Sequence, residues 1–259
     1  NAPVQTPMRK IAPALAAGCT IIVKGSEEVP AGLVEIAAAF EQAGLPPGVL
    51  NIVFGVPAEI SEHLIASPVI RKIAFTGSVP VGKHLAAMAA GEMKLSTMEL
   101  GGHSAAFVFD DADPFEVAQA AVRAKFRNAG QICFAPTRFY VCEAHYDAFA
   151  KALATLAETL RVGPGDAPDS EVGPLTNARR LHATEALVTD AVERGARLLA
   201  GGRRIGDRGF FYAPTVLADV PDTARAMSEE PFGPIAMVNR FAGVEQAVEL
   251  ANRLPYGLG

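Results

Sequence analysis

The stretch IRKIAFTGSVPVGKHLAAMAAGEMKLSTMEL, residues 70–100, decides the fold class of this chain. Its first part, residues 70–77, is a short apolar run typical of a strand, and a Gly-Ser turn ends it. Residues 79–91 carry Pro near the start, apolar residues at helical spacing and Gly at the end. The run 94–100 is again typical of a strand. This order predicts two parallel strands joined by a crossover helix.

The same alternation extends in both directions from this stretch and predicts an α/β fold. Gly101 and Gly102 separate strand-like runs with different surroundings, so we expect two domains, residues 1–101 and 102–259. Before the glycines, further strands are predicted at 19–26 and 49–55, and helices at 30–44 and 57–67. After them, strands are predicted at 104–109, 137–143, 196–200, 212–217 and 235–241, and helices at 112–130, 144–160, 177–194 and 244–254.

Composition favours a globular protein that acts on a small molecule. Half of the 259 residues are hydrophobic, which is enough for a sizeable core. The formal net charge is -5 and no block of Lys and Arg occurs, which argues against nucleic acid or anionic lipid as a partner. The longest apolar stretch, residues 11–23, is interrupted by Pro13 and Gly18 and is too short to span a membrane.

The three cysteines are scattered along the chain and do not resemble a disulfide framework. We therefore expect a reducing compartment, the cytoplasm. Cys19 and Cys142 lie in apolar strand patterns, so we expect both to pack in the core. Cys133, in FRNAGQICFAPTR, follows the end of a predicted helix, where a side chain can face a cleft. It is either a nucleophile or an ordinary small buried residue. No second cysteine or histidine stands at metal-ligand spacing from Cys133, so the sequence does not predict a metal site.

Glu99 and His103 flank the two glycines in TMELGGHS. A carboxylate at the C-terminal edge of a parallel strand lies where α/β sheets bind ligands, which suits a general base. A salt-bridged or helix-capping glutamate is the alternative. We expect His103 to make structural hydrogen bonds instead of pairing with a cysteine.

Three further segments have features of a nucleotide site. Gly77 and Ser78 lie between a strand and a helix whose first N–H groups could bind a phosphate, although a plain turn would look the same. Lys24 and Glu27 follow a strand, where they could bind ribose hydroxyls or stay solvated. Glu230 precedes Pro-Phe-Gly-Pro, a stiff turn that would fix its direction.

Taken as a set, these segments resemble the motifs of the aldehyde dehydrogenase superfamily of NAD(P)-dependent enzymes, with a likeness to semialdehyde dehydrogenases. The resemblance covers the whole chain, and the opening NAP places Asn1 at a family asparagine. It implies a fold of two parallel-sheet, three-layer α/β/α domains that is incomplete, because an N-terminal third and a C-terminal portion would be missing. The matching motifs are VKGSE, FTGS, MELGG, GQICFAPTR and EEPFGP.

The resemblance also implies a mechanism. Cys133 would attack the aldehyde carbon, and the oxyanion of the thiohemiacetal would be held by the Cys133 backbone N–H and the Asn1 amide. After hydride transfer to the nicotinamide, Glu99 would activate the water that hydrolyses the thioester. Lys10 matches a family lysine assigned to proton relay or structural support.

The implied cofactor is NAD, with NADP as the alternative, because Glu27 would repel a 2′-phosphate while Gly25 stands where many members have Pro. The implied substrate is a short or acid-bearing aldehyde such as succinate semialdehyde, with an aromatic aldehyde as the alternative, because aromatic aldehyde oxidisers can share the opening NAP. The full-length protein is expected to be a homo-oligomer. The residues implied to contact the cofactor are Lys24, Glu27, Gly55, Gly77, Ser78, Glu99, Leu100, Cys133, Glu230 and Phe232.

Two other classes of function compete with this interpretation. The chain could be a non-catalytic scaffold or binding fragment that keeps the fold without a complete site. A cysteine hydrolase is disfavoured, because no histidine stands in a recognisable partner motif. Transfer of the acyl group to coenzyme A is disfavoured by Glu99, which argues for water as the acceptor.

Overall fold

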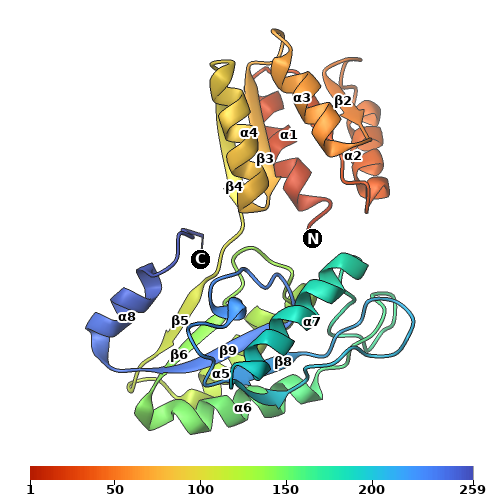
Figure 1. The fold of residues 1–259 in the computed structure, drawn as a ribbon. Coiled ribbons are helices and arrows are strands. Elements are labelled where there is room, and N and C mark those ends of the chain that lie inside the picture. The colour runs from red at the N-terminus through yellow and green to blue at the C-terminus, as the bar shows by residue number, and fades with distance from the viewer. Residues whose placement is uncertain (259) are drawn as a thin grey trace. The chain divides into compact units, whose positions relative to one another are not determined.

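The computed structural model describes residues 1–258, and its strands and helices alternate as the sequence predicts. The chain divides into two compact units, Asn1–Leu100 and Gly101–Gly259, which we call unit 1 and unit 2. Both units are α/β structures built around parallel strands, so the predicted fold class is confirmed (Figure 1).

Unit 1 contains two separate pairs of parallel strands. β1 pairs with β2, and β3 pairs with β4. Each strand is linked to its partner by one of the crossover helices α2 and α4, while α3 joins the two pairs. The elements are α1 (Gln5–Ala16), β1 (Ile21–Lys24), α2 (Pro30–Gln42), β2 (Leu50–Val53), α3 (Pro57–Ala66), β3 (Lys72–Gly77), α4 (Val79–Gly91) and β4 (Leu95–Leu100).

Helix α1 is the one element of unit 1 that the sequence analysis missed. Pro13 lies inside it, and an internal proline lacks the N–H that a helix needs and normally indicates a break. Ile11, on the same helix, is fully buried, and α1 packs against β1. Tertiary packing of the apolar face therefore outweighs the local signal.

Unit 2 contains one five-stranded sheet in the order β5-β6-β9-β8-β7. All neighbours are parallel except β7 and β8, which are antiparallel. Helix α6 packs against several of these strands and beside α5 (Figure 1). The elements are β5 (Ala105–Val108), α5 (Pro114–Phe126), β6 (Arg138–Cys142), α6 (Tyr146–Thr159), α7 (Ala178–Glu193), β7 (Arg197–Ala200), β8 (Thr215–Ala218), β9 (Ile235–Phe241) and α8 (Gly243–Asn252), with short 3-10 turns at Arg127–Gly130, Glu143–His145 and Arg225–Met227.

The strands at the centre of unit 2 are almost completely buried. Every residue of β8 is buried, and so are the first four residues of β9. Continuous apolar runs of this kind are typical of parallel strands that are covered on both faces. Unit 2 therefore has its own hydrophobic core.

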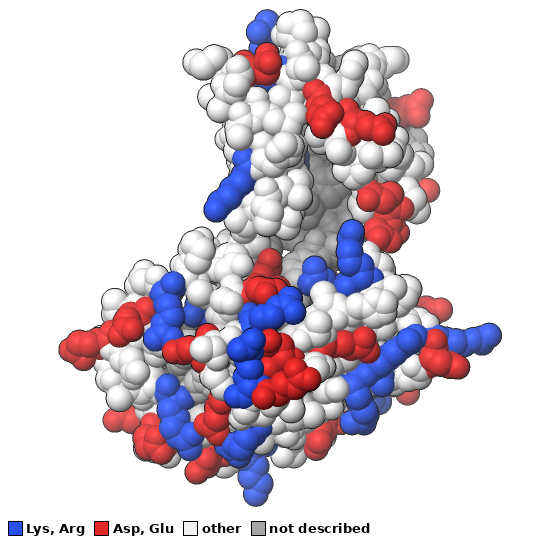
Figure 2. Space-filling model, viewed as in Figure 1, with Lys and Arg blue, Asp and Glu red and all other residues white. Residues whose placement is uncertain are grey.

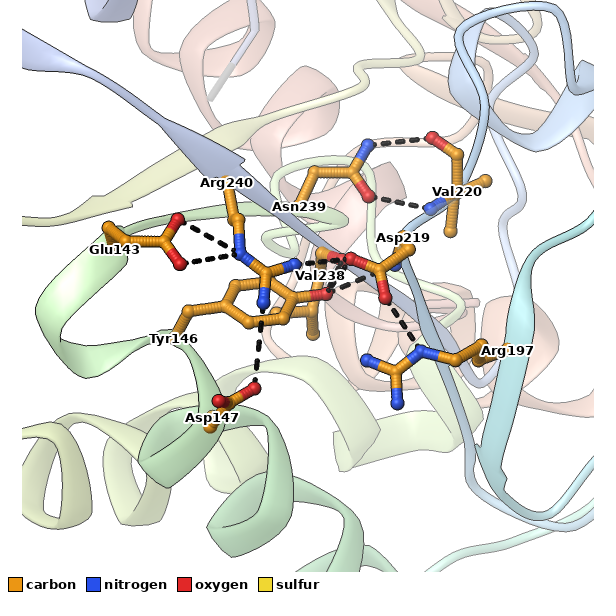
Figure 3. A network of polar contacts seen from close by, with 9 residues as sticks. All are labelled: Glu143, Tyr146, Asp147, Arg197, Asp219, Val220, Val238, Asn239 and Arg240. Atoms are coloured by element: carbon orange, nitrogen blue, oxygen red, sulfur yellow. Dashed lines mark hydrogen bonds and ion pairs between the residues drawn. The ribbon is translucent and has the colours of Figure 1, made fainter.

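A polar network fixes one edge of the unit 2 sheet to α6 (Figure 3). The Tyr146 hydroxyl donates to Asp219 at 2.7 Å, and Arg197 and Arg240 each form an ion pair with Asp219 at 2.6 Å. The Arg240 guanidinium also lies 3.6 Å from the centre of the Tyr146 ring. Burial, aided by the bond to Asp219, raises the pKa of Tyr146 to about 12. These groups satisfy one another, which indicates a structural role.

The surface carries mixed charge, and Figure 2 shows Lys and Arg interspersed with Asp and Glu over the visible face of unit 2. Among residues 1–258, no helix combines the length and the apolar character that crossing a membrane requires.

The expectation for Cys19 is wrong, because this residue is exposed and precedes β1, which begins only at Ile21. Cys142 ends β6 and packs against the core of unit 2, as expected.

Candidate active site

In unit 1 the predicted cofactor residues lie at the carboxyl ends of parallel strands. Lys24 is the last residue of β1, and Gly55 follows β2. Gly77 and Leu100 end β3 and β4 and are paired in register. Open α/β sheets bind ligands at this edge, and within each pair of strands the register brings together residues that are far apart in sequence.

Lys24 and Glu27 form an ion pair, with 2.7 Å between Nζ and Oε2. Next to them, the ring of Phe54 fills the space that a side chain on Gly25 would occupy. A proline at position 25 would therefore require Phe54 to move. The local backbone of this segment is adapted to glycine.

Gly77 and Ser78 form the entry to α4. Ser78 is the N-cap residue, but its side chain makes no capping hydrogen bond. The Phe75 ring occupies the space beside Gly77 that a Cβ would need. The first turn of α4 thus presents backbone N–H groups that no side chain caps, which is an arrangement suited to an anion.

Glu99 belongs to a polar cluster formed by α1, β3 and β4. The Thr76 hydroxyl donates to Glu99 at 3.4 Å, and Lys10 donates to the Thr76 hydroxyl at 2.5 Å. Arg9 lies 3.7 Å from the Glu99 carboxylate. Burial lowers the pKa of Lys10, and the charge of Glu99 opposes this shift. The structure brings the predicted Lys10 and Glu99 together, through a threonine that the sequence analysis did not consider.

Two other predicted residues of unit 1 lie at different depths. Asn1 is exposed and precedes α1. Leu100 is half-buried, and its side chain fills the space beside Gly82 of α4.

In unit 2, Cys133 lies on a turn that follows a left-handed stretch of backbone. Asn128, Ala129 and Gly130 have φ angles of 54°, 53° and 69°. The backbone N–H of Ala135 then donates to the carbonyl of Ile132 at 3.1 Å and closes the turn around the cysteine. Left-handed backbone at non-glycine residues costs about 1 kcal/mol or more each and is concentrated at functional sites. Cys133 itself is partly exposed.

The side chain of Gln131 anchors the cysteine turn, and the sequence analysis did not identify it. Its amide nitrogen donates to the carbonyls of Asn128 and Pro174, each at 3.2 Å. Its oxygen accepts from the backbone N–H and the hydroxyl of Thr176, each at 2.9 Å. Nothing in the sequence near Gln131 indicates that the segment at 174–176 lies against it.

Glu230 lies against the two glycines that begin unit 2. The N–H of Gly102 donates to Glu230 Oε1 at 3.2 Å, and a side chain on Gly101 would collide with the same carboxylate. A Cβ on Gly102 would lie 2.7 Å from the carbonyl oxygen of Cys133. The glycine pair thus allows the Glu230 turn and the cysteine turn to approach one backbone segment. Burial raises the pKa of Glu230, and the Gly102 N–H opposes the rise.

Arg180 of α7 holds the segment that follows Glu230. It donates to the carbonyl of Pro231 at 3.2 Å, and its guanidinium lies 5.6 Å from the centre of the Phe232 ring. Phe232 has a φ of 38°, an unfavourable value for a bulky residue. Glu230 and Phe232 are therefore positioned by an arginine that no local motif predicts.

His103 is a structural residue, as expected. It is buried, and its ring nitrogens contact the Thr137 hydroxyl at 2.6 Å and the Ala226 carbonyl at 2.9 Å. Burial lowers its pKa to about 3, so the ring is neutral near pH 7. Both nitrogens are engaged, so His103 is not available as the base of a cysteine-histidine pair.

The arrangement offers a thiol on a constrained turn, a carboxylate beside an amine and a hydroxyl, and strand ends suited to a nucleotide. Within the described residues, no group of three or more His, Cys, Asp or Glu could hold a metal ion. Taken unit by unit, the cysteine turn of unit 2 suits nucleophilic attack by sulfur, and the Glu99 cluster of unit 1 suits proton transfer to a carboxylate.

Comparison with known proteins identifies the family to which this chain is similar. The sequence model described as "Aldehyde dehydrogenase family" matches residues 1–259. The chain is 48% identical over all of its length to 4-(hydroxymethyl)benzenesulfonate dehydrogenase of Comamonas testosteroni, of which it covers 53%. It is 43% identical over its length to the mitochondrial succinate-semialdehyde dehydrogenase of Arabidopsis thaliana, of which it covers 49%.

A solved structure gives the same result. The crystal structure of succinate-semialdehyde dehydrogenase from Burkholderia pseudomallei matches 98% of the chain with a TM-score of 0.96 at 42% identity, and the chain covers 53% of it. The chain therefore spans about half the length of the relatives it matches.

Proposed function

Because this chain belongs to the aldehyde dehydrogenase family, we propose that the whole protein oxidises an aldehyde to a carboxylic acid, with NAD or NADP as the hydride acceptor. The observation that carries the proposal is the position of Cys133. It is partly exposed on a turn anchored by Gln131, and its carbonyl lies against the same glycine whose N–H binds Glu230. A thiol held in this way is constrained as a nucleophile has to be.

In this proposal the Cys133 thiolate forms a bond to the aldehyde carbon. The Cys133 N–H and the Asn1 amide hold the resulting oxyanion, where the negative charge develops. A bound NAD or NADP would supply the hydride acceptor, and Cys133 would then carry the acyl group as a thioester. Glu99 takes a proton from the water that attacks this thioester, and the carboxylic acid leaves as the thiolate is restored.

The cluster around Glu99 supports its role as the base. Lys10 is placed to orient the Thr76 hydroxyl, which in turn donates to Glu99. Of the two roles proposed for Lys10, proton relay and structural support, this geometry favours structural support, because Thr76 lies between the Lys10 amine and the Glu99 carboxylate. Arg9 completes the cluster, with 3.7 Å between its guanidinium and the Glu99 carboxylate.

We assign the cofactor to the strand ends of unit 1 and to the Glu230 turn of unit 2. The uncapped helix start at Ser78 would bind the pyrophosphate, and Lys24 with Glu27 the adenosine ribose. Glu230 and Phe232 would hold the nicotinamide half. The Glu27 carboxylate favours NAD, but Lys24 partly neutralises it, so NADP is the alternative. In this assignment residues 1–101 are the cofactor-binding domain and 102–259 the catalytic domain.

The proposed substrate is an aldehyde that carries an acidic group. The names of two relatives support this class, since one contains a semialdehyde of succinate and another a benzenesulfonate. The whole protein is proposed to be a homo-oligomer.

The proposal is tested by screening the whole protein against carboxylate- and sulfonate-bearing aldehydes with both cofactors. Cys133→Ala is expected to lower kcat/KM by more than about a thousandfold, because the covalent step is lost. Cys19→Ala, which removes an exposed cysteine of unit 1, is the matched control and should leave the rate unchanged. Full turnover by Cys133→Ala would end the proposal.

Cofactor binding and cysteine labelling, measured on the whole protein, distinguish an enzyme from a scaffold. An enzyme should bind NADH, and a thiol-reactive probe should label Cys133 faster than Cys19 and Cys142. Absence of cofactor binding, together with three equally slow cysteines, would favour the scaffold.

A further inference from the structure

Lys125 is a buried cation that the proposed chemistry does not use. It lies in the last turn of α5, is fully buried, and its amine has no hydrogen-bond partner among the described residues. Long charged side chains normally extend to bring the charge into water. A buried amine without a bond is costly, and an apolar side chain would fill the same space at lower cost. Packing therefore does not account for a lysine here.

The amine lies at the junction of the two segments that form the unit 2 part of the site. A Cβ on Gly130, in the left-handed stretch before Cys133, would lie 3.2 Å from Lys125 Nζ. The same Cβ would collide with the carbonyl of Gly233, at the end of the Glu230 turn. The Lys125 amine thus lies beneath the point where the cysteine turn and the Glu230 turn meet.

The charged groups around this point belong to several elements. Glu230 is the carboxylate that attracts Lys125, and Arg180 of α7 faces the same carboxylate. The charge of Lys125 also lowers the pKa of His103, but burial is the largest cause of that shift and keeps the ring neutral near pH 7. Burial lowers the pKa of Lys125 to about 7, and Glu230 opposes this shift. The charge of Lys125 can therefore change under ordinary conditions, whereas Arg180 remains charged.

We propose that Lys125 is a positioning residue whose buried ammonium holds the Glu230 carboxylate, through their mutual attraction, in the place where it binds the nicotinamide ribose. This inference rests on the proposed function and extends it to a residue outside the motifs of the site. Since the attraction is lost when the amine is neutral, the affinity for the cofactor falls as the pH rises through about 7. His103 and Arg180 do not change charge in this range.

The test is the dissociation constant of NADH, measured by fluorescence titration of the whole protein at about pH 6 and pH 8.5. Lys125→Met keeps the length of the side chain and removes the charge. It is expected to weaken NADH binding about tenfold at the lower pH and little at the higher pH. Lys151→Met, at an exposed lysine of α6, is the matched control and should bind NADH as the wild type does.

Three further measurements separate positioning from a general structural effect. In a Glu230→Gln background, Lys125→Met should have no additional effect on the dissociation constant, because the two residues act as one unit. The thermal unfolding midpoint of Lys125→Met should equal or exceed that of the wild type, since burying the Lys125 charge costs more than its attraction to Glu230 returns. Glu230→Gln alone should also abolish the pH dependence of NADH binding, a measurement that does not require any Lys125 variant to fold.

The outcomes distinguish this inference from the proposed function. Equal NADH affinity of the wild type and Lys125→Met at pH 6, or an equal loss in the Glu230→Gln background, would overturn the role of Lys125 alone. Failure of the wild type to bind NADH at either pH would overturn both. Retained, pH-dependent NADH binding without oxidation of any aldehyde would sustain the inference and contradict the proposed function.

Discussion

The two units of this chain hold their candidate site residues in different ways. In unit 1 the strands remain half-exposed, and the buried apolar side chains are few: Ile11, Leu33, Ile65, Leu85 and Ala89. In unit 2 the central strands are enclosed by a continuous core. Within residues 1–258, unit 2 thus encloses its own central strands, whereas the strands of unit 1 stay partly open. Substitutions in unit 2 should therefore affect stability and chemistry together, whereas those in unit 1 should affect chemistry more than stability.

The largest expected difference between the units is the cost of a cavity. Leu153 of α6 is fully buried in the core of unit 2, and Leu33 of α2 is one of the few buried leucines of unit 1. Leu153→Ala is expected to lower the free energy of unfolding by about 4 kcal/mol and Leu33→Ala by about 2 kcal/mol, both within the usual range of about 2–5 kcal/mol. Urea denaturation of the whole protein measures both values. Equal losses for the two variants would show that a cavity costs the same in unit 1 as in unit 2.

A second contrast concerns glycines. A side chain on Gly102 would meet the carbonyls of Leu258 and Cys133, whereas one on Gly91, at the end of α4, would meet nothing. Gly102→Ala is expected to cost about 3 kcal/mol and to lower activity, while Gly91→Ala should gain about 0.5 kcal/mol from the lower entropy of the unfolded chain. Thermal unfolding and steady-state kinetics measure both effects. A harmless Gly102→Ala would contradict the close approach of the two turns.

Two lysines, the part-buried Lys94 and the fully buried Lys125, should respond to loss of their charge with opposite changes in stability. Lys94 of unit 1 donates to the carbonyls of Ile65 and Ser67, whereas the Lys125 amine has no such partner among the described residues. Lys94→Met should destabilise the protein by about 1–3 kcal/mol, because two carbonyls lose their donor. Lys125→Met should stabilise it by about 1–4 kcal/mol at about pH 6.

The pH dependence of this difference has a defined sign. The pKa of Lys125 is lowered from 10.5 to about 7 in the folded protein, so between these values the unfolded chain binds more protons. The contribution of Lys125 to the free energy of unfolding of the wild type therefore rises with pH between about pH 7 and pH 10.5. The advantage of Lys125→Met is complete below about pH 7 and shrinks toward pH 10. Guanidinium unfolding at several pH values measures it, and a constant difference would show that Lys125 is not neutral when folded.

The smallest expected effect on stability is at the Lys24–Glu27 pair. This ion pair is largely exposed at Glu27, so Lys24→Met should change the free energy of unfolding by less than about 1 kcal/mol. The dissociation constant of NADH should nevertheless rise, because the pair is proposed to bind the adenosine ribose. An unchanged dissociation constant would remove this pair from the cofactor site.

The elements of the fold were largely predictable because their signals are local. Apolar periodicity and the Gly and Pro residues at their ends are sufficient for strands such as β3 and helices such as α4. The prediction failed where a local signal opposed the packing. Pro13 indicated a break, so α1 was not predicted, and the strand predicted from residue 19 begins only at Ile21.

The site was predictable only where a motif contains the residue. Cys133, Glu99 and Glu230 lie in recognisable segments, but the contacts that position them cannot be read from those segments. Gln131 acts on a segment more than forty residues away, at Thr176, and Arg180 reaches Pro231 from a different helix. Such contacts depend on tertiary approach, which no single-sequence pattern encodes.

The most direct test of the account is to trap the acyl group on Cys133. The Glu99→Gln variant of the whole protein is mixed with an acid-bearing aldehyde and NAD, quenched in acid, digested and analysed by mass spectrometry. The account predicts a burst of about one NADH per Cys133, and a thioester on the peptide that contains this residue, because hydride transfer proceeds while hydrolysis stalls. Turnover at the wild-type rate, or an acyl group on Cys19 or Cys142 instead, would contradict it.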